Sequence, residues 1–265
     1  MHRFLIALTT MITVMAANAF RVDTLLVHNK CLDTSNEVTV VVPENNGTQK
    51  FPVVYLLHGY SDNNRCYIDR IKGLGEMSDR YKMIFVTPNG RDSWYWDSDS
   101  IKMETFIVKG LVPYIDKIYP VLPGRENRAI MGLSMGGHGS FYLALRHPEI
   151  WGNIGSMSGG LDLLPFPTNW NLPKILGSTS DKDPEKWKAH SVAYMIPQIK
   201  AGNFNIIFDC GSEDFFAEVN DNMHRALLEA GVPHDYISRP GGHNWQYWNN
   251  ALPYILHYFD TKFPR

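Results

Sequence analysis

The chain of 265 residues carries 25 Lys and Arg against 27 Asp and Glu, which gives a formal net charge of −2. A composition that is 44% hydrophobic and 20% charged is that of a globular protein and excludes an intrinsically disordered chain. The near-neutral charge, without a long basic run, argues against a nucleic-acid partner, because phosphate binding needs clustered Lys and Arg. The length favours one domain of the larger α/β kind, with two small domains as the alternative.

The first residues have the features of a secretory signal peptide. Met1-His2-Arg3 is a short basic start, residues 4–16 are apolar apart from threonines, and Ala17-Asn18-Ala19 has the A-x-A form of a cleavage site. The apolar run is shorter than the roughly 20 residues that a membrane-spanning helix needs. We therefore expect cleavage after Ala19, a single mature domain over residues 20–265, no membrane insertion after cleavage, and a location in a periplasm or outside the cell.

The cysteines point to neither a disulfide framework nor a metal site. Cys31, Cys66 and Cys210 would meet an oxidising environment after export, where one pair could form a disulfide, but an odd number leaves at least one thiol unpaired. Their spacing suggests no metal ligand set, so buried apolar cysteine is the favoured role. We expect a protein without a metal or an organic cofactor.

Strand patterns alternate with helical patterns along the chain. The expected strands are residues 38–42, 53–57, 83–86, 129–131, 154–157, 204–208 and 235–238. The expected helices are residues 65–80, 101–119, 134–146, 216–230 and 245–259. Residues 161–187 show little helical periodicity and are expected as a long loop. This alternation predicts an α/β fold with a mostly parallel sheet and helices on both faces, and ligands at the carboxyl ends of its strands.

The loop after residues 129–131 contains a candidate nucleophile. Gly132-Leu133-Ser134-Met135-Gly136 has the form G-x-S-x-G between an expected strand and an expected helix, which is the context of a nucleophile elbow. Glycine at both flanks removes Cβ atoms that a tight turn would bring against the backbone. The following helix directs its N-terminus at the same place, where it favours negative charge. Ser134 is therefore the predicted nucleophile.

A serine hydroxyl needs a general base, which this fold places after the nucleophile in the sequence. His243 lies in the glycine-lined loop 240–245, after the last expected strand and at its carboxyl end. The other histidines after Ser134 lie on expected helices or at the wrong end of a strand, apart from His190, which remains the alternative. We predict His243 as the base.

The acid that orients the base should follow the penultimate strand. Asp209, Glu213 and Asp214 compete in the exit loop 209–215. The bend at Gly211-Ser212 favours Asp214, although an Asp at this position is also a suitable N-cap for the next helix. A carboxylate here would hold the imidazole in one tautomer and stabilise its cation.

The oxyanion donors are expected to be backbone groups. One should be the amide of Met135, directly after the nucleophile, and the second the amide of Tyr60, in the loop that follows residues 53–57. His58 precedes this loop and suits a role in holding it better than a role as base.

Four stretches together resemble one family. These are Y-L-L-H-G at 55–59, G-L-S-M-G-G at 132–137, C-G-S-E-D-F at 210–215 and G-H-N-W-Q-Y-W at 242–248. They are similar to the “putative esterase” family of α/β-hydrolases, which includes carbohydrate esterase family 1 feruloyl and acetylxylan esterases, tributyrin esterases, S-formylglutathione hydrolases and mycolyltransferases. The resemblance runs from about residue 22 to the C-terminus. It implies a triad of Ser134, Asp214 and His243 and oxyanion amides at Tyr60 and Met135.

The resemblance extends to the substrate loops. The segment N-G-R-D-S-W-Y-W at 89–96 resembles a loop of small esterases, whose aromatic residues could stack on a sugar or a phenolic acid. The alternative is that Trp94 or Trp96 only packs the loop. In this family, an insertion such as residues 161–187 tends to form part of the acyl pocket wall. The side chains expected to contact substrate are His58, Trp94, Tyr95, Trp96, Trp170 and Trp245.

These features predict a secreted serine carboxylesterase that acts through an acyl-enzyme. The resemblance and the expected export point to feruloyl or acetyl esters of plant cell-wall polysaccharide, in the context of xylan degradation. An acyltransferase would use the same triad. An S-formylglutathione hydrolase shares the motifs but is normally cytosolic, which the signal peptide disfavours. A carbohydrate-binding module is the non-enzyme alternative, and an intact triad disfavours it.

Overall fold

The computed structural model describes residues 20–29, 34–45 and 47–264. The predicted signal peptide and Cys31 lie outside these residues. The described residues form one sheet of eight strands in the order β1-β2-β4-β3-β5-β6-β7-β8. From β4 to β8 all neighbours are parallel, whereas β2 runs antiparallel to both β1 and β4. The strands are β1 (Arg21–Asn29), β2 (Thr34–Val42), β3 (Val53–Leu57), β4 (Ile84–Pro88), β5 (Arg128–Leu133), β6 (Asn153–Met157), β7 (Asn205–Gly211) and β8 (Asp235–Arg239).

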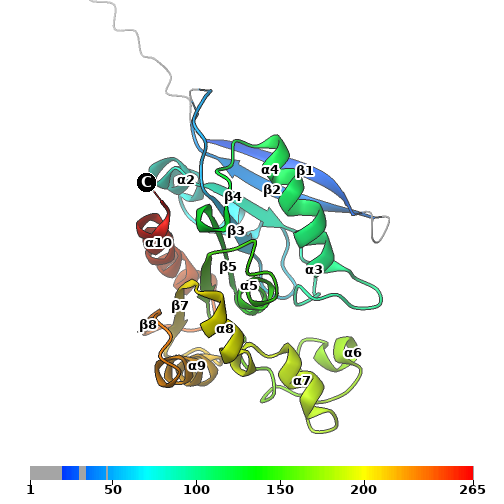
Figure 1. Cartoon of the computed structure of the whole chain (residues 1–265). Helices are drawn as coiled ribbons and strands as arrows, with labels where there is room; N and C mark the ends of the chain where they lie inside the picture. The colour runs from blue at the N-terminus through cyan, green and yellow to red at the C-terminus, as the bar shows by residue number, and fades with distance from the viewer. Residues whose placement is uncertain (1–19, 30–33, 46, 265) are drawn as a thin grey trace, which may run out of the picture.

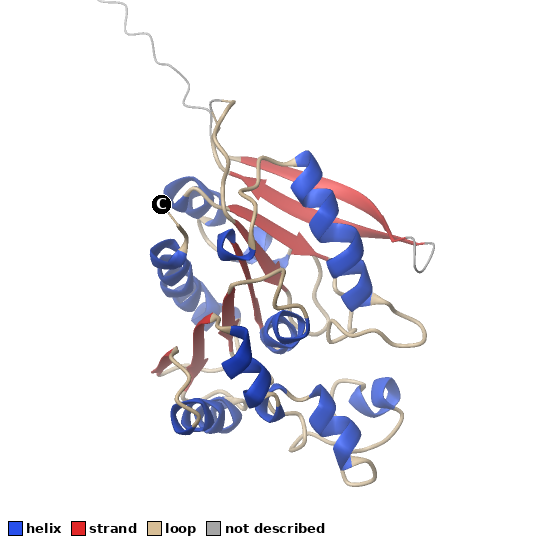
Figure 2. Cartoon of the chain, in the orientation of Figure 1, coloured by secondary structure: helices blue, strands red, loops and turns tan. Residues whose placement is uncertain are grey.

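Helices cover both faces of this sheet (Figure 2). Helices α1, α2 and α10 pack on one face, and α4, α5, α8 and α9 pack on the other (Figure 1). The α-helices are α1 (Cys66–Arg70), α2 (Leu74–Tyr81), α3 (Met103–Thr105), α4 (Val112–Ile118), α5 (Met135–Arg146), α6 (Leu172–Leu176), α7 (Pro184–His190), α8 (Ile196–Gly202), α9 (Ala217–Glu229) and α10 (Trp245–Lys262). The 3₁₀ turns are η2 (Arg125–Asn127) and η3 (Val192–Tyr194), and η1 (Phe106–Leu111) is a π-helix. The predicted α/β architecture is confirmed.

The central strands are apolar throughout because both of their faces are covered. In β3, Val53, Tyr55 and Leu57 belong to the core under α5, whereas Val54 and Leu56 belong to the core under α10. All five side chains are fully buried. The continuous apolar run that predicted this strand therefore reflects two hydrophobic layers, one on each side of the sheet.

Four expectations from the sequence need correction. The strand β1 was not expected, and it pairs antiparallel with β2 at the edge of the sheet. The helix expected over 65–80 is two helices, interrupted where Gly73 adopts φ 71°. The helix expected over 101–119 begins at Met103 and contains the π-helical turn η1. Residues 161–187 are not a structureless loop, since they form α6 and part of α7, which lie beyond the sheet (Figure 1).

Helix α4 offers a matched test of the core. Ile115 is fully buried, whereas Ile118, one turn later, is 43% exposed. We expect Ile115→Ala to lower the free energy of unfolding by about 2–5 kcal/mol, through lost burial and the cavity that remains. Ile118→Ala should change it by about 0.5 kcal/mol or less. Urea unfolding of the two variants measures the difference, and equal losses would contradict the packing described.

Candidate active site

The turn at Ser134 connects β5 to α5 and holds the serine in a strained conformation. Ser134 has φ 55° and ψ −119°, which is a sparsely populated backbone region for a residue other than glycine. The neighbouring backbone leaves no room for side chains at the flanks. A Cβ atom at Gly132 would lie 2.4 Å from the carbonyl oxygen of Gly136, and one at Gly136 would lie 2.1 Å from that of Leu57. The two glycines therefore permit the close approach that presents the Ser134 hydroxyl.

His243 lies beside this hydroxyl. It belongs to the loop between β8 and α10, and its Nε2 is 2.9 Å from Ser134 Oγ. Its Nδ1 is 2.9 Å and 3.0 Å from the two carboxylate oxygens of Asp214, which is buried. Because a carboxylate accepts hydrogen bonds, Nδ1 carries the hydrogen and Nε2 is free to accept the proton of Ser134. This arrangement can activate a hydroxyl for attack on a carbonyl carbon.

Asp214 also supports the chain that follows it. Its Oδ1 accepts a hydrogen bond of 2.8 Å from the backbone N–H of Phe216, and its carbonyl accepts one of 2.9 Å from Ala217. The helix α9 begins at Ala217, with no side-chain cap. The interpretation of Asp214 as the N-cap of α9 is therefore wrong, since Phe216 occupies that position, whereas the carboxylate of Asp214 bonds His243 and the turn before the helix.

The structure places the alternative candidates away from Ser134. His190 ends α7, where its ring packs against Trp96 at 4.8 Å between centroids.

Within the described chain, the other two acidic candidates form no hydrogen bond with His243. Glu213 is exposed, and its backbone N–H donates to the carbonyl of Gly241. Asp209 is buried on the far side of the loop, where it accepts hydrogen bonds from Arg239 and the hydroxyl of Tyr247. Of the three acidic candidates, Asp214 is the residue that bonds His243.

The proposed oxyanion amides lie at the same end of the sheet. A Cβ atom at Gly59 would be 3.4 Å from Ser134 Cβ, so the turn that carries Tyr60 lies directly beside the nucleophile. Met135 is the first residue of α5, and the first amides of a helix have no partner within it. Within the described part of the chain, neither the Tyr60 nor the Met135 amide donates a hydrogen bond. Both donors are thus available to a ligand.

His58 holds the turn that carries Tyr60 through two hydrogen bonds. Its Nδ1 donates to the carbonyl of Gly59 over 2.7 Å, and its Nε2 accepts from the N–H of Gly90 over 2.8 Å. Burial lowers the pKa of His58, so the neutral ring suits these two bonds. The side chain is fully buried with both nitrogens engaged. The expectation that His58 contacts substrate is therefore replaced by a role in shaping the Tyr60 turn.

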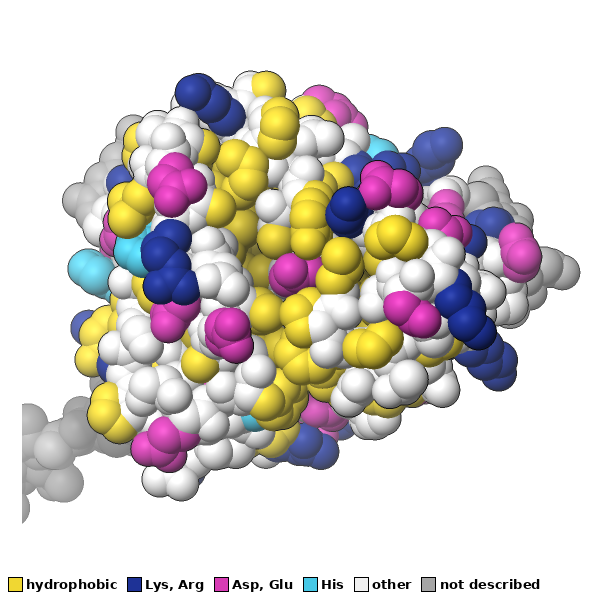
Figure 3. Space-filling model, turned by 90° about the horizontal axis from the view of Figure 1, so that it is seen from below, with side chains coloured by type: hydrophobic (Ala, Val, Ile, Leu, Met, Phe, Trp, Pro, Cys, Tyr) yellow, Lys and Arg dark blue, Asp and Glu magenta, His cyan; other side chains and the backbone are white. Residues whose placement is uncertain are grey.

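A pocket of about 430 Å³ opens above Ser134 and His243. Besides these two residues, its lining consists of Gly59, Tyr60, Ser61, Asp62, Arg70, Leu133, Trp170, Phe215, Asn244, Trp245 and Trp248. Trp170 and Trp245, which were predicted to contact substrate, are among them. On the side of the molecule where α6, α7 and α9 lie, hydrophobic side chains gather around a central hollow (Figure 3).

The aromatic loop at 94–96 lies elsewhere. Trp94, Tyr95 and Trp96 are 1%, 0% and 2% exposed, and the two indole rings pack against His138 of α5. Burial lowers the pKa of His138 to about 3. Tyr95 donates its hydroxyl to the carbonyl of His58 over 3.0 Å. The prediction that these three residues bind substrate is corrected: they fill the interior beneath the site, because the loop turns them inward.

Sequence reasoning missed several residues of the pocket. Phe215 follows Asp214 directly and is 52% exposed, with its ring 4.2 Å from that of His243. The ring of Trp248 lies 5.0 Å from the same imidazole between centroids, at an interplanar angle of 86°. Both residues belong to the sequence stretches 210–215 and 242–248 that carry Asp214 and His243, and this was the available signal. No such signal existed for Asp62 and Arg70. Both line the pocket because of how the chain folds after β3, which no local sequence pattern shows.

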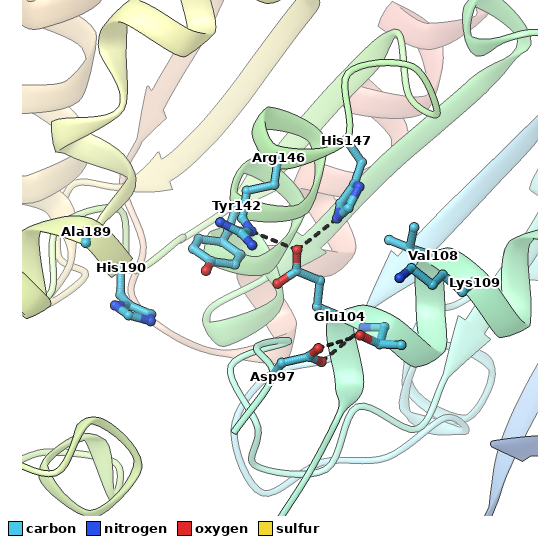
Figure 4. Close-up of a pocket in the computed structure, with 10 residues that line it drawn as sticks. Asp97, Glu104, Val108, Lys109, Tyr142, Arg146, His147, Ala189 and His190 are labelled. Atoms are coloured by element: carbon cyan, nitrogen blue, oxygen red, sulfur yellow. Dashed lines mark hydrogen bonds and ion pairs between the residues drawn. The ribbon is translucent and has the colours of Figure 1, made fainter. Parts of the chain in front are cut away.

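A second hollow, of about 490 Å³, lies at the other end of α5 (Figure 4). Its buried Glu104 accepts hydrogen bonds from Arg146 and His147. Burial alone would raise the pKa of Glu104, but these bonds lower it below its usual value. The hollow shares no lining residue with the pocket above Ser134.

The cysteines of the described segments are unpaired. Cys66 and Cys210 are both buried free thiols, and burial raises the pKa of each. Among the residues 20–29, 34–45 and 47–264, no group of three or more His, Cys, Asp or Glu side chains is placed to hold a metal ion. None of the described helices combines the length and the hydropathy needed to cross a membrane.

The fold and this arrangement of Ser, His and Asp are those of an α/β-hydrolase. Residues 30–259 match the family model described as “Putative esterase”, and the chain belongs to this family. An acetyl esterase of Caldicellulosiruptor saccharolyticus is 26% identical, over 85% of this chain and 92% of the relative. An S-formylglutathione hydrolase of Bos taurus is also 26% identical, over 73% and 77%.

A solved ferulic acid esterase has a similar structure. It superimposes with a TM-score of 0.78 and 31% sequence identity, and the match covers 93% of this chain and 99% of that one. Together with the family match, this likeness identifies the protein as a serine carboxylic ester hydrolase.

The neighbouring carboxylates of Glu213 and Asp214 allow a direct test of which one orients His243. We expect Asp214→Asn to lower kcat for ester hydrolysis by about 10⁴-fold, because an amide no longer fixes the reactive tautomer of His243. Glu213→Gln removes the neighbouring charge without touching the imidazole and should keep kcat within about twofold. Steady-state kinetics with p-nitrophenyl acetate measures both, and a comparable loss in Glu213→Gln would contradict the assignment.

Proposed function

We propose that Ser134, His243 and Asp214 are the catalytic residues of this esterase, with the amides of Tyr60 and Met135 as its oxyanion hole. The observation that carries the proposal is the continuous hydrogen-bonded chain from Ser134 Oγ through both nitrogens of His243 to Asp214. This chain lies at the base of an open pocket, where an ester carbonyl can reach the hydroxyl.

The reaction follows from this geometry in two halves. Ser134 Oγ attacks the ester carbonyl carbon while His243 Nε2 takes its proton, and the amides of Tyr60 and Met135 stabilise the oxyanion. The tetrahedral intermediate expels the alcohol, which receives that proton from His243, and leaves an acyl group on Ser134. His243 then removes a proton from water, which attacks the acyl carbon. Collapse of the second intermediate releases the acid and returns the proton to Ser134.

We further propose that the substrates are feruloyl or acetyl esters of plant cell-wall polysaccharide. The similarity to a ferulic acid esterase and to an acetyl esterase supports these acyl groups. The pocket also offers aromatic surface, since the rings of Trp170 and Phe215 stack with 5.9 Å between centroids and an interplanar angle of 28°. Flat rings of this kind suit an aromatic acyl group.

Export would place the enzyme where such polymers occur. The A-x-A pattern at Ala17-Asn18-Ala19 after a short apolar run supports this part of the proposal. Expression of the full chain with a secretion-competent host should yield extracellular or periplasmic protein whose N-terminal residue is Phe20, as N-terminal sequencing would establish. Protein that keeps residues 1–19 and stays in the cytoplasm would contradict export.

The catalytic proposal predicts that removing the hydroxyl oxygen of Ser134 abolishes most of the esterase activity. Ser134→Ala should lower kcat for p-nitrophenyl acetate, methyl ferulate and acetylated xylan by about 10³-fold or more, because no nucleophile remains. Ser140→Ala, in the helix α5 that follows Ser134, is the matched control, since the Ser140 hydroxyl donates to backbone carbonyls of Gly137 and Gly155 instead. Spectrophotometric and chromatographic product assays measure each rate. Retained turnover in Ser134→Ala would overturn the proposal.

A further inference from the structure

The pocket above Ser134 has two chemically different sides. One side is aromatic and apolar, where Trp170 and Phe215 stack beside His243. The other side carries Asp62, Arg70 and Trp245, which together provide a carboxylate, a guanidinium and an indole ring. A substrate that fills the whole pocket must therefore combine an apolar part with a part rich in polar groups.

Arg70 is held in place on the polar side. Its guanidinium donates to the carboxylate of Asp62 over 3.2 Å and lies 5.2 Å above the centre of the Trp245 ring. Its backbone is fixed as well, since Asn249 of α10 donates to the Arg70 carbonyl and accepts from the Lys72 N–H, both over 2.9 Å. These contacts fasten the end of α1 to the start of α10, so that the guanidinium is positioned before any ligand arrives.

Arg70 and Asp62 can both form further hydrogen bonds with a ligand in the pocket. The Arg70 side chain is 51% exposed, and within the described chain its guanidinium donates to Asp62 alone. A guanidinium has five N–H donors, so most of them are free, while the carboxylate of Asp62 supplies acceptors. Together the two groups are neutral, which favours a neutral ligand that both donates and accepts over an ion.

The polar side is also close to the reacting atoms. Asp62 belongs to the turn that carries Tyr60, and its N–H donates to the carbonyl of Gly59 over 3.3 Å. Trp245 follows His243 by two residues and opens α10. A group bound by Arg70 would therefore lie in the same pocket as an ester carbonyl at Ser134.

We infer that Arg70, backed by Asp62 and Trp245, is a specificity-determining residue that binds the hydroxyl groups of the sugar carrying the ester. The inference rests on the proposed function and deepens it: the apolar side takes the acyl group, and the polar side takes the sugar. Such a site makes the enzyme prefer sugar esters to alkyl esters with the same acyl group, because sugar hydroxyls can pair with Arg70 and a methyl group cannot.

Two substrates with the same acyl group isolate this effect. Wild type and Arg70→Met, which retains apolar contact with Trp245, are compared on methyl ferulate and on a feruloyl ester of arabinose. We expect the ratio of kcat/KM for the sugar ester to kcat/KM for the methyl ester to fall about tenfold in Arg70→Met, the effect of losing one hydrogen bond to a charged group. The change should reside mainly in KM.

Arg65→Met is the matched control. Arg65 is 50% exposed and pairs with Asp69 over 2.8 Å, but it does not line the pocket. In this variant, the ratio of kcat/KM for the sugar ester to kcat/KM for the methyl ester should equal that of the wild type. An unchanged ratio in Arg70→Met, or an equal fall in Arg65→Met, would overturn the inference.

A binding measurement separates this inference from the proposed function. Calorimetric titration of the sugar ester into Ser134→Ala and into Ser134→Ala/Arg70→Met requires no turnover. We expect about tenfold weaker binding in the double variant. Equal affinities would contradict the role of Arg70, whether or not the wild type hydrolyses the ester. Failure of the wild type to hydrolyse any ester, with the affinity difference intact, would instead contradict the proposed catalysis.

Discussion

The hydrogen bond between Ser134 and His243 is the contact on which the account of this protein depends. It joins side chains 109 positions apart in the sequence, and it exists because β5, β7 and β8 end at the same edge of the sheet. The loops after β7 and β8 are joined to each other by backbone hydrogen bonds from Ser212 to Arg239 and from Glu213 to Gly241. The position of the imidazole is thus set by the sheet and by the hydrogen bonds between these two loops.

Tight packing under the site makes this geometry possible. The strained backbone of Ser134 is retained because Gly132 and Gly136 let α5 approach the end of β3. The aromatic loop that follows β4 fills the space beneath, and Tyr95 and His58 connect it to the Tyr60 turn. Buried aromatic residues therefore act on the reaction indirectly, by fixing the backbone whose amides face the substrate.

The sequence predicted the central strands and the elbow well because both leave local signals. The apolar run at 53–57 and the glycines around Ser134 are recognisable within a few residues. The aromatic residues at 94–96 were misassigned because composition does not show which way a loop turns its side chains, and positive φ at Trp94 and Tyr95 turns these inward. Arg70 was missed because its place depends on tertiary contacts with Asp62 and Asn249, which no local pattern reveals.

Covalent labelling tests the central claim most directly. A fluorophosphonate reacts with a serine only when an adjacent base has activated its hydroxyl. After treatment with diisopropyl fluorophosphate, peptide mass spectrometry should find one phosphoryl adduct per chain, on the peptide that contains Ser134, and His243→Ala should abolish it. An unlabelled wild type, or an adduct on another serine such as Ser158 or Ser140, would contradict the account.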